Sequence, residues 1–165
     1  MEEKFKFSQE NILKAYDIIK KYPKGKERSA VMPLLWLAQE QNDNWVSMNA
    51  MDYIAELLNI PSMQVYEVAN FYTMYNKEQI GKYLIQICRT TPCWLCGSND
   101  ILEVCKTELN IGLGETTPDG LFSLVEVECL GACTASPMAQ INNINYENLT
   151  KEKMIEIISD LKNKE

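Results

Sequence analysis

Four of the chain's six cysteines form two closely spaced pairs. Cys88 and Cys93 are separated by four residues in ICRTTPC, and Cys129 and Cys133 by three residues in CLGAC. Because two thiolates on one short loop can bind the same metal ion, this spacing predicts a metal centre with cysteine ligands. The chain contains no histidine. That excludes imidazole ligation of zinc, a Rieske cluster, a histidine-ligated haem and histidine acid–base catalysis.

Several kinds of site are compatible with this spacing. The two pairs suit a [2Fe–2S] cluster, with one iron on each pair. Cys96 forms a C-x2-C motif with Cys93, so a four-cysteine zinc site on Cys93, Cys96, Cys129 and Cys133 is an alternative. Cys88, Cys93 and Cys96 also match the plant-type ferredoxin spacing, with a distant fourth ligand. A Cys93–Cys96 redox dithiol and a set of inert buried cysteines are the remaining alternatives.

The sixth cysteine, Cys105, belongs to a different pattern. It lies at helical spacing from Ile101 and Leu109, on the apolar face of a predicted helix. Free cysteine is among the residue types most often found buried. We therefore predict that Cys105 packs in the core and binds no metal.

The segments that carry the cysteine pairs alternate between strand and helix patterns. Residues 83–88 form an apolar strand, Ser98 is predicted to cap a helix, and residues 121–129 alternate as a second strand. A hairpin over 138–146 and a last helix capped by Thr150 complete the order β-α-β-β-β-α. Because a strand–helix–strand unit makes a right-handed parallel crossover, this order predicts a thioredoxin-like α/β domain.

The predicted parallel strands bring the two cysteine pairs together. Cys88 and Cys129 each stand at the carboxyl end of one of these strands. Both pairs are therefore expected at the same edge of the sheet. Gly97 and Gly131 lie where the backbone is expected to turn tightly beside the site.

The first half of the chain has a helical pattern instead. Apolar residues recur at helical spacing in four segments, with Ser8 and Ser47 as predicted caps and Pro61 opening the fourth. We predict an N-terminal helical bundle over residues 1–79 and the thioredoxin-like domain over residues 80–165. The helices carry three methionines that are expected to fill the bundle core, Met48, Met51 and Met63.

Composition limits the classes of partner. The 165 residues carry a formal net charge of −7, which argues against nucleic acid or anionic lipid as the main partner. No secretory signal, transit peptide or bilayer-spanning apolar run is recognisable, so we expect a soluble cytoplasmic protein. In a reducing compartment, clustered cysteines favour metal binding over structural disulfides.

Longer motifs around the cysteines resemble those of a known family. The segments ICRTTPCWLCGS, GETTPDGLFSLVEVECLGAC and SPMAQIN, with VYEVANFYTMYN upstream, are similar to the thioredoxin-like [2Fe–2S] subunit of respiratory complex I, the NADH:quinone oxidoreductase. The resemblance extends from about Met32 to Thr150. The missing transit peptide favours the bacterial form.

The resemblance implies an electron-transfer subunit without a complete active site or catalytic residue of its own. The family's cluster motif, carried over residue by residue, falls on Cys88, Cys93, Cys129 and Cys133, and leaves Cys96 as an extra thiol. The resemblance also implies one [2Fe–2S] cluster and a flavin-containing NADH-binding partner subunit beside other peripheral-arm subunits. The complex would hold the chain at the cytoplasmic face of the inner membrane, without direct insertion. The chain has no G-x-G-x-x-G fingerprint and no P-loop, which agrees with nucleotide binding by the partner.

Two groups of residues are candidates for the partner-facing surface. They are the aromatic stretch Phe71, Tyr72, Met74 and Tyr75, and the ligand loops around Trp94 and Leu130. For Phe71 and Tyr72, packing inside the protein is the favoured interpretation, because large aromatic side chains are usually buried.

Overall fold

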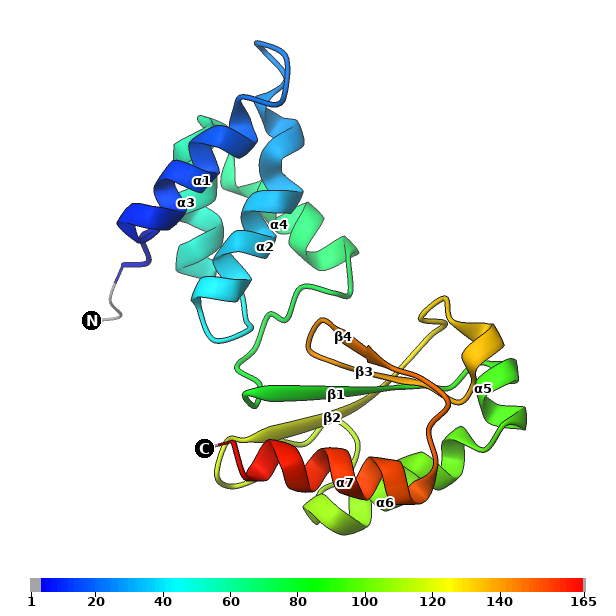
Figure 1. The fold of residues 1–165 in the computed structure, drawn as a ribbon. Helices are drawn as coiled ribbons and strands as arrows, with labels where there is room; N and C mark the ends of the chain where they lie inside the picture. The colour runs from blue at the N-terminus through cyan, green and yellow to red at the C-terminus, as the bar shows by residue number, and fades with distance from the viewer. Residues whose placement is uncertain (1–3, 165) are drawn as a thin grey trace. The chain divides into compact units, whose positions relative to one another are not determined.

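The computed structural model describes residues 4–164. The chain divides between Gln79 and Ile80 into two compact units, of which the first is helical and the second contains a β-sheet (Figure 1). Within the described part of the chain, no helix combines the length and apolar character needed to cross a membrane.

The helical unit surrounds one hydrophobic core, to which Leu34, Leu35 and Ile54 contribute fully buried side chains. Its elements are α1 (Gln9–Ile19), the 3-10 helix η1 (Glu27–Ala30), α2 (Val31–Gln41), α3 (Met48–Leu58) and α4 (Ser62–Phe71). The predicted caps are confirmed, because the hydroxyls of Ser8 and Ser47 each accept a hydrogen bond from the backbone N–H three residues later.

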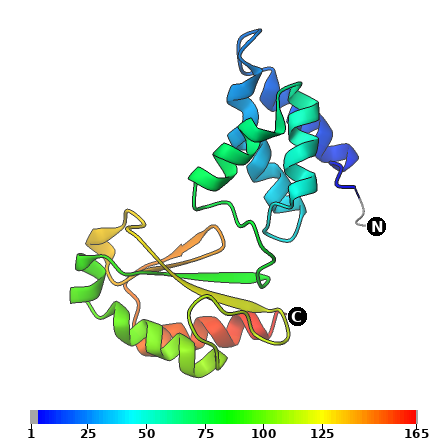
Figure 2. The same ribbon diagram turned by 180° about the vertical axis from the view of Figure 1, so that it is seen from behind.

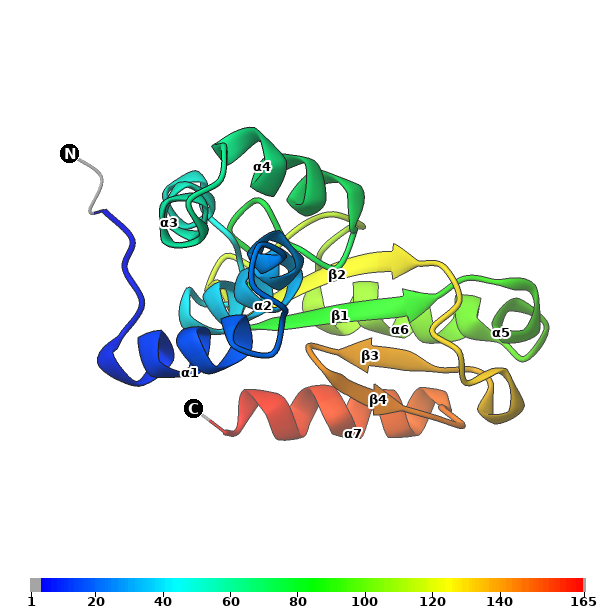
Figure 3. The same ribbon diagram turned by 90° about the horizontal axis from the view of Figure 1, so that it is seen from above.

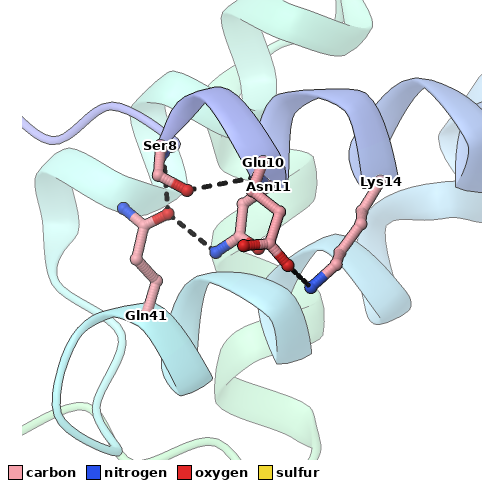
Figure 4. Close-up of polar contacts among 5 residues, drawn as sticks. All are labelled: Ser8, Glu10, Asn11, Lys14 and Gln41. Atoms are coloured by element: carbon pink, nitrogen blue, oxygen red, sulfur yellow. Dashed lines mark hydrogen bonds and ion pairs between the residues drawn. The ribbon is translucent and has the colours of Figure 1, made fainter.

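The start of α1 is tied to the end of α2 (Figure 4). Oε1 of Gln41 accepts hydrogen bonds from the Ser8 backbone N–H and from Nδ2 of Asn11, both at 2.9 Å. An ion pair between Glu10 and Lys14 bridges one turn of α1 at 2.6 Å. The two hydrogen bonds to Gln41 hold the start of α1 against the end of α2.

Two of the three methionines expected in this core lie on the surface instead. Met51 is buried, but Met48 and Met63 are 64% and 62% exposed. Met48 is the first residue of α3 and precedes its buried stripe, which begins at Ala50. Met63 is two positions before the buried Val65, so it faces the opposite side of α4.

The aromatic stretch that begins with the last residue of α4 is also more exposed than expected. Phe71 is 77% exposed, and Tyr72 and Met74 are partly exposed. Phe71 stands two positions after the buried Ala69, which turns its ring away from the core. Only Tyr75 of this group is buried, and its hydroxyl donates to the carbonyl oxygen of Met32.

The second unit is built on a four-stranded sheet with the order β2-β1-β3-β4. Its elements are β1 (Tyr83–Cys88), α5 (Thr91–Leu95), α6 (Ser98–Leu109), β2 (Phe122–Val127), the 3-10 helix η2 (Cys133–Ala135), β3 (Ala139–Ile141), β4 (Ile144–Tyr146) and α7 (Lys151–Lys162). Strands β1 and β2 are parallel, and β3 is antiparallel to both of its neighbours. Helices α6 and α7 pack side by side on one face of the sheet (Figures 1 and 2).

The predicted order of strands and helices is confirmed, with one additional short helix, α5. The cap of the last helix is also confirmed, because the Thr150 hydroxyl accepts a bond from the Lys153 N–H. The cap predicted for α6 is wrong. Ser98 is the first residue of the helix, and Gly97 precedes it with φ +94°. The chain leaves α5 through this left-handed conformation, which glycine adopts at little cost.

Candidate metal centre

The two cysteine pairs follow the ends of neighbouring parallel strands. Cys88 is the last residue of β1 and lies opposite Val127, the last residue of β2. In Figure 3 the arrowheads of both strands point toward the end of the sheet where α5 lies. Because parallel strands end at the same edge, the loop after β2 returns Cys129 and Cys133 to the neighbourhood of Cys88.

Each pair is presented by a different local structure. Cys93 lies in the short helix α5, which begins three residues after the end of β1 and has Pro92 near its N-terminus. Cys129 and Cys133 flank a loop in which Gly131 has φ +85°, and η2 begins at Cys133. A glycine there lets the loop reverse within three residues.

The thiols interact within each loop, and their charges also act between the two loops. The Cys129 and Cys133 sulfurs are 3.5 Å apart, and Cys88 and Cys93 lie in one buried cluster. The pKa of Cys133 is raised, first by its hydrogen bond to Cys129 and the charge of that group, and further by the charges of Cys93 and Cys88. The charges of the other three thiols therefore reach Cys133 from both loops.

Burial divides the four thiols into two classes. Cys88 and Cys93 are each only 1% exposed and form a small buried cluster with Met138, against which Leu130 packs. Cys129 and Cys133 are exposed. The site thus has one side closed by apolar side chains and one side open to the surface.

The Cys88 sulfur receives several hydrogen-bond donors. Burial is the largest single influence and would raise its pKa, but donation from the Thr90 hydroxyl, the Thr90 N–H, the Leu130 N–H and the Cys93 thiol outweighs it. The pKa of Cys88 therefore lies below its ordinary value. The Leu130 N–H comes from the opposite loop, so the two loops support the same sulfur.

The other thiols have fewer donors. Burial raises the pKa of Cys93 despite its contacts with the Ser136 hydroxyl and the Met138 N–H. The Gly131 N–H donates to the Cys129 sulfur at 3.4 Å. Charge-assisted N–H···S contacts of this kind are typical of thiolates that ligate metal.

The two remaining cysteines lie outside this arrangement. Cys96, at the end of α5, is exposed and lines a separate depression of about 250 Å³ with residues of α6 and α7. Cys105 is fully buried in the core of the second unit, and burial raises its pKa to about 12. The prediction that Cys105 packs in the core is confirmed.

Sequence reasoning missed the polar groups that support the sulfurs. Thr90 and Ser136 place hydroxyls 3.3 Å from the Cys88 sulfur and 3.4 Å from the Cys93 sulfur. The position of Thr90, two residues after a strand-ending cysteine, was an available signal. Ser136 had none, because only the fold brings it near Cys93.

Each of the two loops supplies one pair of cysteines. Among residues 4–164, no group of three or more cysteine or carboxylate side chains is arranged to hold one metal ion. A binuclear cluster needs two thiolates for each iron, and the two loops supply two each.

Comparison with known proteins identifies the family. A sequence model of the thioredoxin-like [2Fe–2S] ferredoxins matches residues 15–162. The chain belongs to this family. As a thioredoxin-like [2Fe–2S] ferredoxin it has the predicted α/β fold class and one [2Fe–2S] cluster, and the zinc alternative is not favoured.

This ferredoxin has similar curated relatives. It is 52% identical to the E subunit of the NADH-quinone oxidoreductase of Rickettsia felis, over 99% of this chain and 98% of the relative. It is also 52% identical to "NADH dehydrogenase [ubiquinone] flavoprotein 2, mitochondrial" of Dictyostelium discoideum, over 96% of this chain and 64% of that protein. Among solved structures, a chain of an NAD+-reducing [NiFe]-hydrogenase in the air-oxidized state has a TM-score of 0.68. The identity is 18%, over 79% of this chain and 23% of the other, so this likeness concerns the fold.

The donor set of the ferredoxin fits such a cluster. Four sulfurs come from two loops at one end of the sheet, and backbone N–H groups of Leu130, Met138 and Gly131 hydrogen-bond three of them. These donors offset the cost of placing negative sulfur in a partly buried site.

Proposed function

We propose that this chain is the electron-transfer subunit of an NADH:quinone oxidoreductase of the complex I type. Its single [2Fe–2S] cluster is held by Cys88, Cys93, Cys129 and Cys133. The meeting of the C-x4-C and C-x3-C loops at one sheet edge carries this proposal. It is supported by relatives that bear the name of such a subunit and match over nearly their whole length.

The chain's own residues hold, shield and stabilise the site. A bound [2Fe–2S] cluster supplies one-electron chemistry. Met138 and Leu130 keep water away from the Cys88 and Cys93 side. Donors around Cys88 stabilise negative charge on its sulfur, and the exposed Cys129 and Cys133 give a redox partner access.

We infer that this partner is a flavin-containing NADH-binding subunit, beside other subunits of the peripheral arm at the cytoplasmic face of the membrane. NADH delivers two electrons together as hydride, whereas a flavin can release them singly. The site on this chain accepts single electrons, and the sequence has no dinucleotide fingerprint. The partner therefore oxidises NADH, and this chain receives the electrons one at a time.

The surface beside Cys93 suits contact with that partner. Trp94 and Leu95, next to Cys93 in α5, are 56% and 71% exposed. Adjacent large apolar side chains at the surface are typical of protein interfaces. A Trp94→Ala variant should bind the flavin-containing partner more weakly in a pull-down or calorimetric titration. Unchanged binding would remove Trp94 from the interface.

Iron and acid-labile sulfide analysis with absorption and EPR spectra tests the function directly. We expect equal amounts of iron and sulfide, equivalent to one cluster per chain, and an EPR signal only after reduction. In stopped-flow experiments, NADH should not bleach the isolated chain but should bleach it once the flavin-containing partner is added. A colourless protein that binds zinc, or bleaching of the isolated chain by NADH, would contradict the proposal.

We further propose that the two units are separate domains, a helical bundle over 1–79 and the ferredoxin domain over 80–165. Limited proteolysis should then cut first between them, near residue 80. A first cut inside either unit, with no product ending near residue 80, would argue against this division.

A further inference from the structure

Thr90 occupies a helix-capping position without capping the helix. It precedes α5 with the extended backbone typical of an N-cap, but its side chain makes no bond to the first turn. Its Oγ1 instead lies 3.3 Å from the Cys88 sulfur. Ser47 and Thr150, in the same position on α3 and α7, do cap their helices. The hydroxyl of Thr90 therefore contacts the Cys88 sulfur instead of making a capping hydrogen bond to α5.

The Thr90 proton is available for that sulfur. Among the described residues, Oγ1 of Thr90 has one hydrogen-bond partner, the Cys88 sulfur. Ser136 differs, because its hydroxyl donates to the Cys133 carbonyl oxygen at 2.9 Å while lying 3.4 Å from the Cys93 sulfur. A hydroxyl carries one proton, so Ser136 cannot donate to both acceptors at once.

We propose that Thr90 is a positioning residue whose hydroxyl raises the reduction potential of the cluster by donating to the Cys88 sulfur. This inference rests on the proposed function, which makes Cys88 a ligand. Reduction is the uptake of one electron, and the added negative charge is shared by the sulfurs. A donor to a sulfur therefore stabilises the reduced form more than the oxidised form. The effect is enhanced because the Cys88 side chain is 1% exposed, where screening by water is weak.

The experiment is a redox titration of the full chain with dithionite, followed by absorption and EPR. Thr90→Val keeps the shape and removes the hydroxyl, while Thr90→Ser keeps the hydroxyl. Thr91→Val is the matched control, since Thr91 is the next residue, is exposed, and belongs to the same motif. We expect Thr90→Val to make reduction roughly tenfold less favourable, which is a shift of about 59 mV to lower potential for a one-electron couple. Thr90→Ser should stay near the unsubstituted protein, and Thr91→Val should not shift.

Iron content, sulfide content and thermal melting accompany each titration. Because Thr90 does not cap α5, Thr90→Val should melt like the unsubstituted protein. A fully loaded Thr90→Val protein with an unchanged potential would overturn the inference, and so would an equal shift in Thr90→Ser. If Thr90→Val and Thr90→Ala both fail to load while Thr90→Ser loads fully, the hydroxyl serves assembly and the inference about potential is wrong. Absence of iron and sulfide in the unsubstituted protein would instead refute the proposed function, and this inference with it.

Discussion

Cys88 and Cys93 reach the same end of the sheet as Cys129 and Cys133, but the first pair is buried and the second is exposed. The first pair stands on a strand end and a helix, elements whose backbone bonds fix the positions of the sulfurs. The second pair stands on a loop that depends on Gly131. The same residue type thus stands in two environments, one shielded by apolar side chains and one open to the surface.

Comparison of Cys88 with Cys105 shows what lowers the pKa of a buried thiol. Cys88 and Cys105 are almost equally inaccessible, yet the pKa of Cys88 is lowered and that of Cys105 is raised to about 12. Burial alone favours the neutral thiol. The donors from Thr90 and Leu130 reverse that preference at Cys88. Hydrogen bonding at Cys88, together with the deeper burial of Cys105, gives the two pKa values their opposite directions.

The largest expected effect comes from replacing ligands on the two sides. Cys88→Ser should lose essentially all bound iron, because a hydroxyl in a buried site fitted to sulfur is a poor ligand. Cys129→Ser should keep a measurable fraction, because its exposed loop can adjust. Iron and sulfide analysis with EPR measures both, and Cys105→Ser is the control that should remain fully loaded. Equal losses at Cys88 and Cys129 would remove the functional distinction between the pairs.

A smaller effect is expected from alkaline pH on the cluster-free protein. The folded chain keeps the Cys105 proton up to a pKa of about 12, while the unfolded chain releases it near 9.0. The contribution of Cys105 to folding is therefore complete below pH 9 and is lost as the pH rises toward 12, by up to about 4 kcal/mol. The free energy of unfolding, measured by urea titration across this pH range, should fall less steeply with pH in Cys105→Ala than in the unsubstituted protein. The same slope in both proteins would contradict the cause assigned to the shift.

The smallest expected effect is a difference in alkylation rates. In the cluster-free protein, iodoacetamide should modify Cys129 and Cys133 faster than Cys88 by about tenfold or more, because access limits the reaction. The lowered pKa of Cys88 acts in the opposite direction by providing more thiolate. Peptide mass spectrometry over time separates the sites, with exposed Cys96 and buried Cys105 as references. Faster modification of Cys88 would show that thiolate content outweighs burial.

The sequence predicted the strands, the crossover and the core thiol because each depends on short-range patterns. Apolar alternation marks a strand, and Cys105 shares a helical face with Ile101. Helix α5 was missed because five residues are too few for periodicity to show. Ser98 was misassigned as a cap because a serine before a helix resembles one, whereas the turn at Gly97 takes that role.

The supporting groups at the site could not be predicted in the same way. Ser136 and the Met138 N–H approach Cys93 from a segment far along the chain. The exposure of Met63 and Phe71 also depended on helix phase, since each stands two residues from a buried position. Hydrophobic type alone does not determine which side of a helix faces the core.

The crossover between β1 and β2 also has a consequence for biosynthesis. The ribosome synthesises Cys88, Cys93 and Cys96 first. The loop that carries Cys129 and Cys133 follows only after α6 and β2 have been translated. Until β2 pairs with β1, these cysteines lack the neighbouring loop that carries Cys129 and Cys133. If the proposed ligand set is right, it is complete only after β2 has been translated and has paired with β1, so the cluster would be assembled after the crossover.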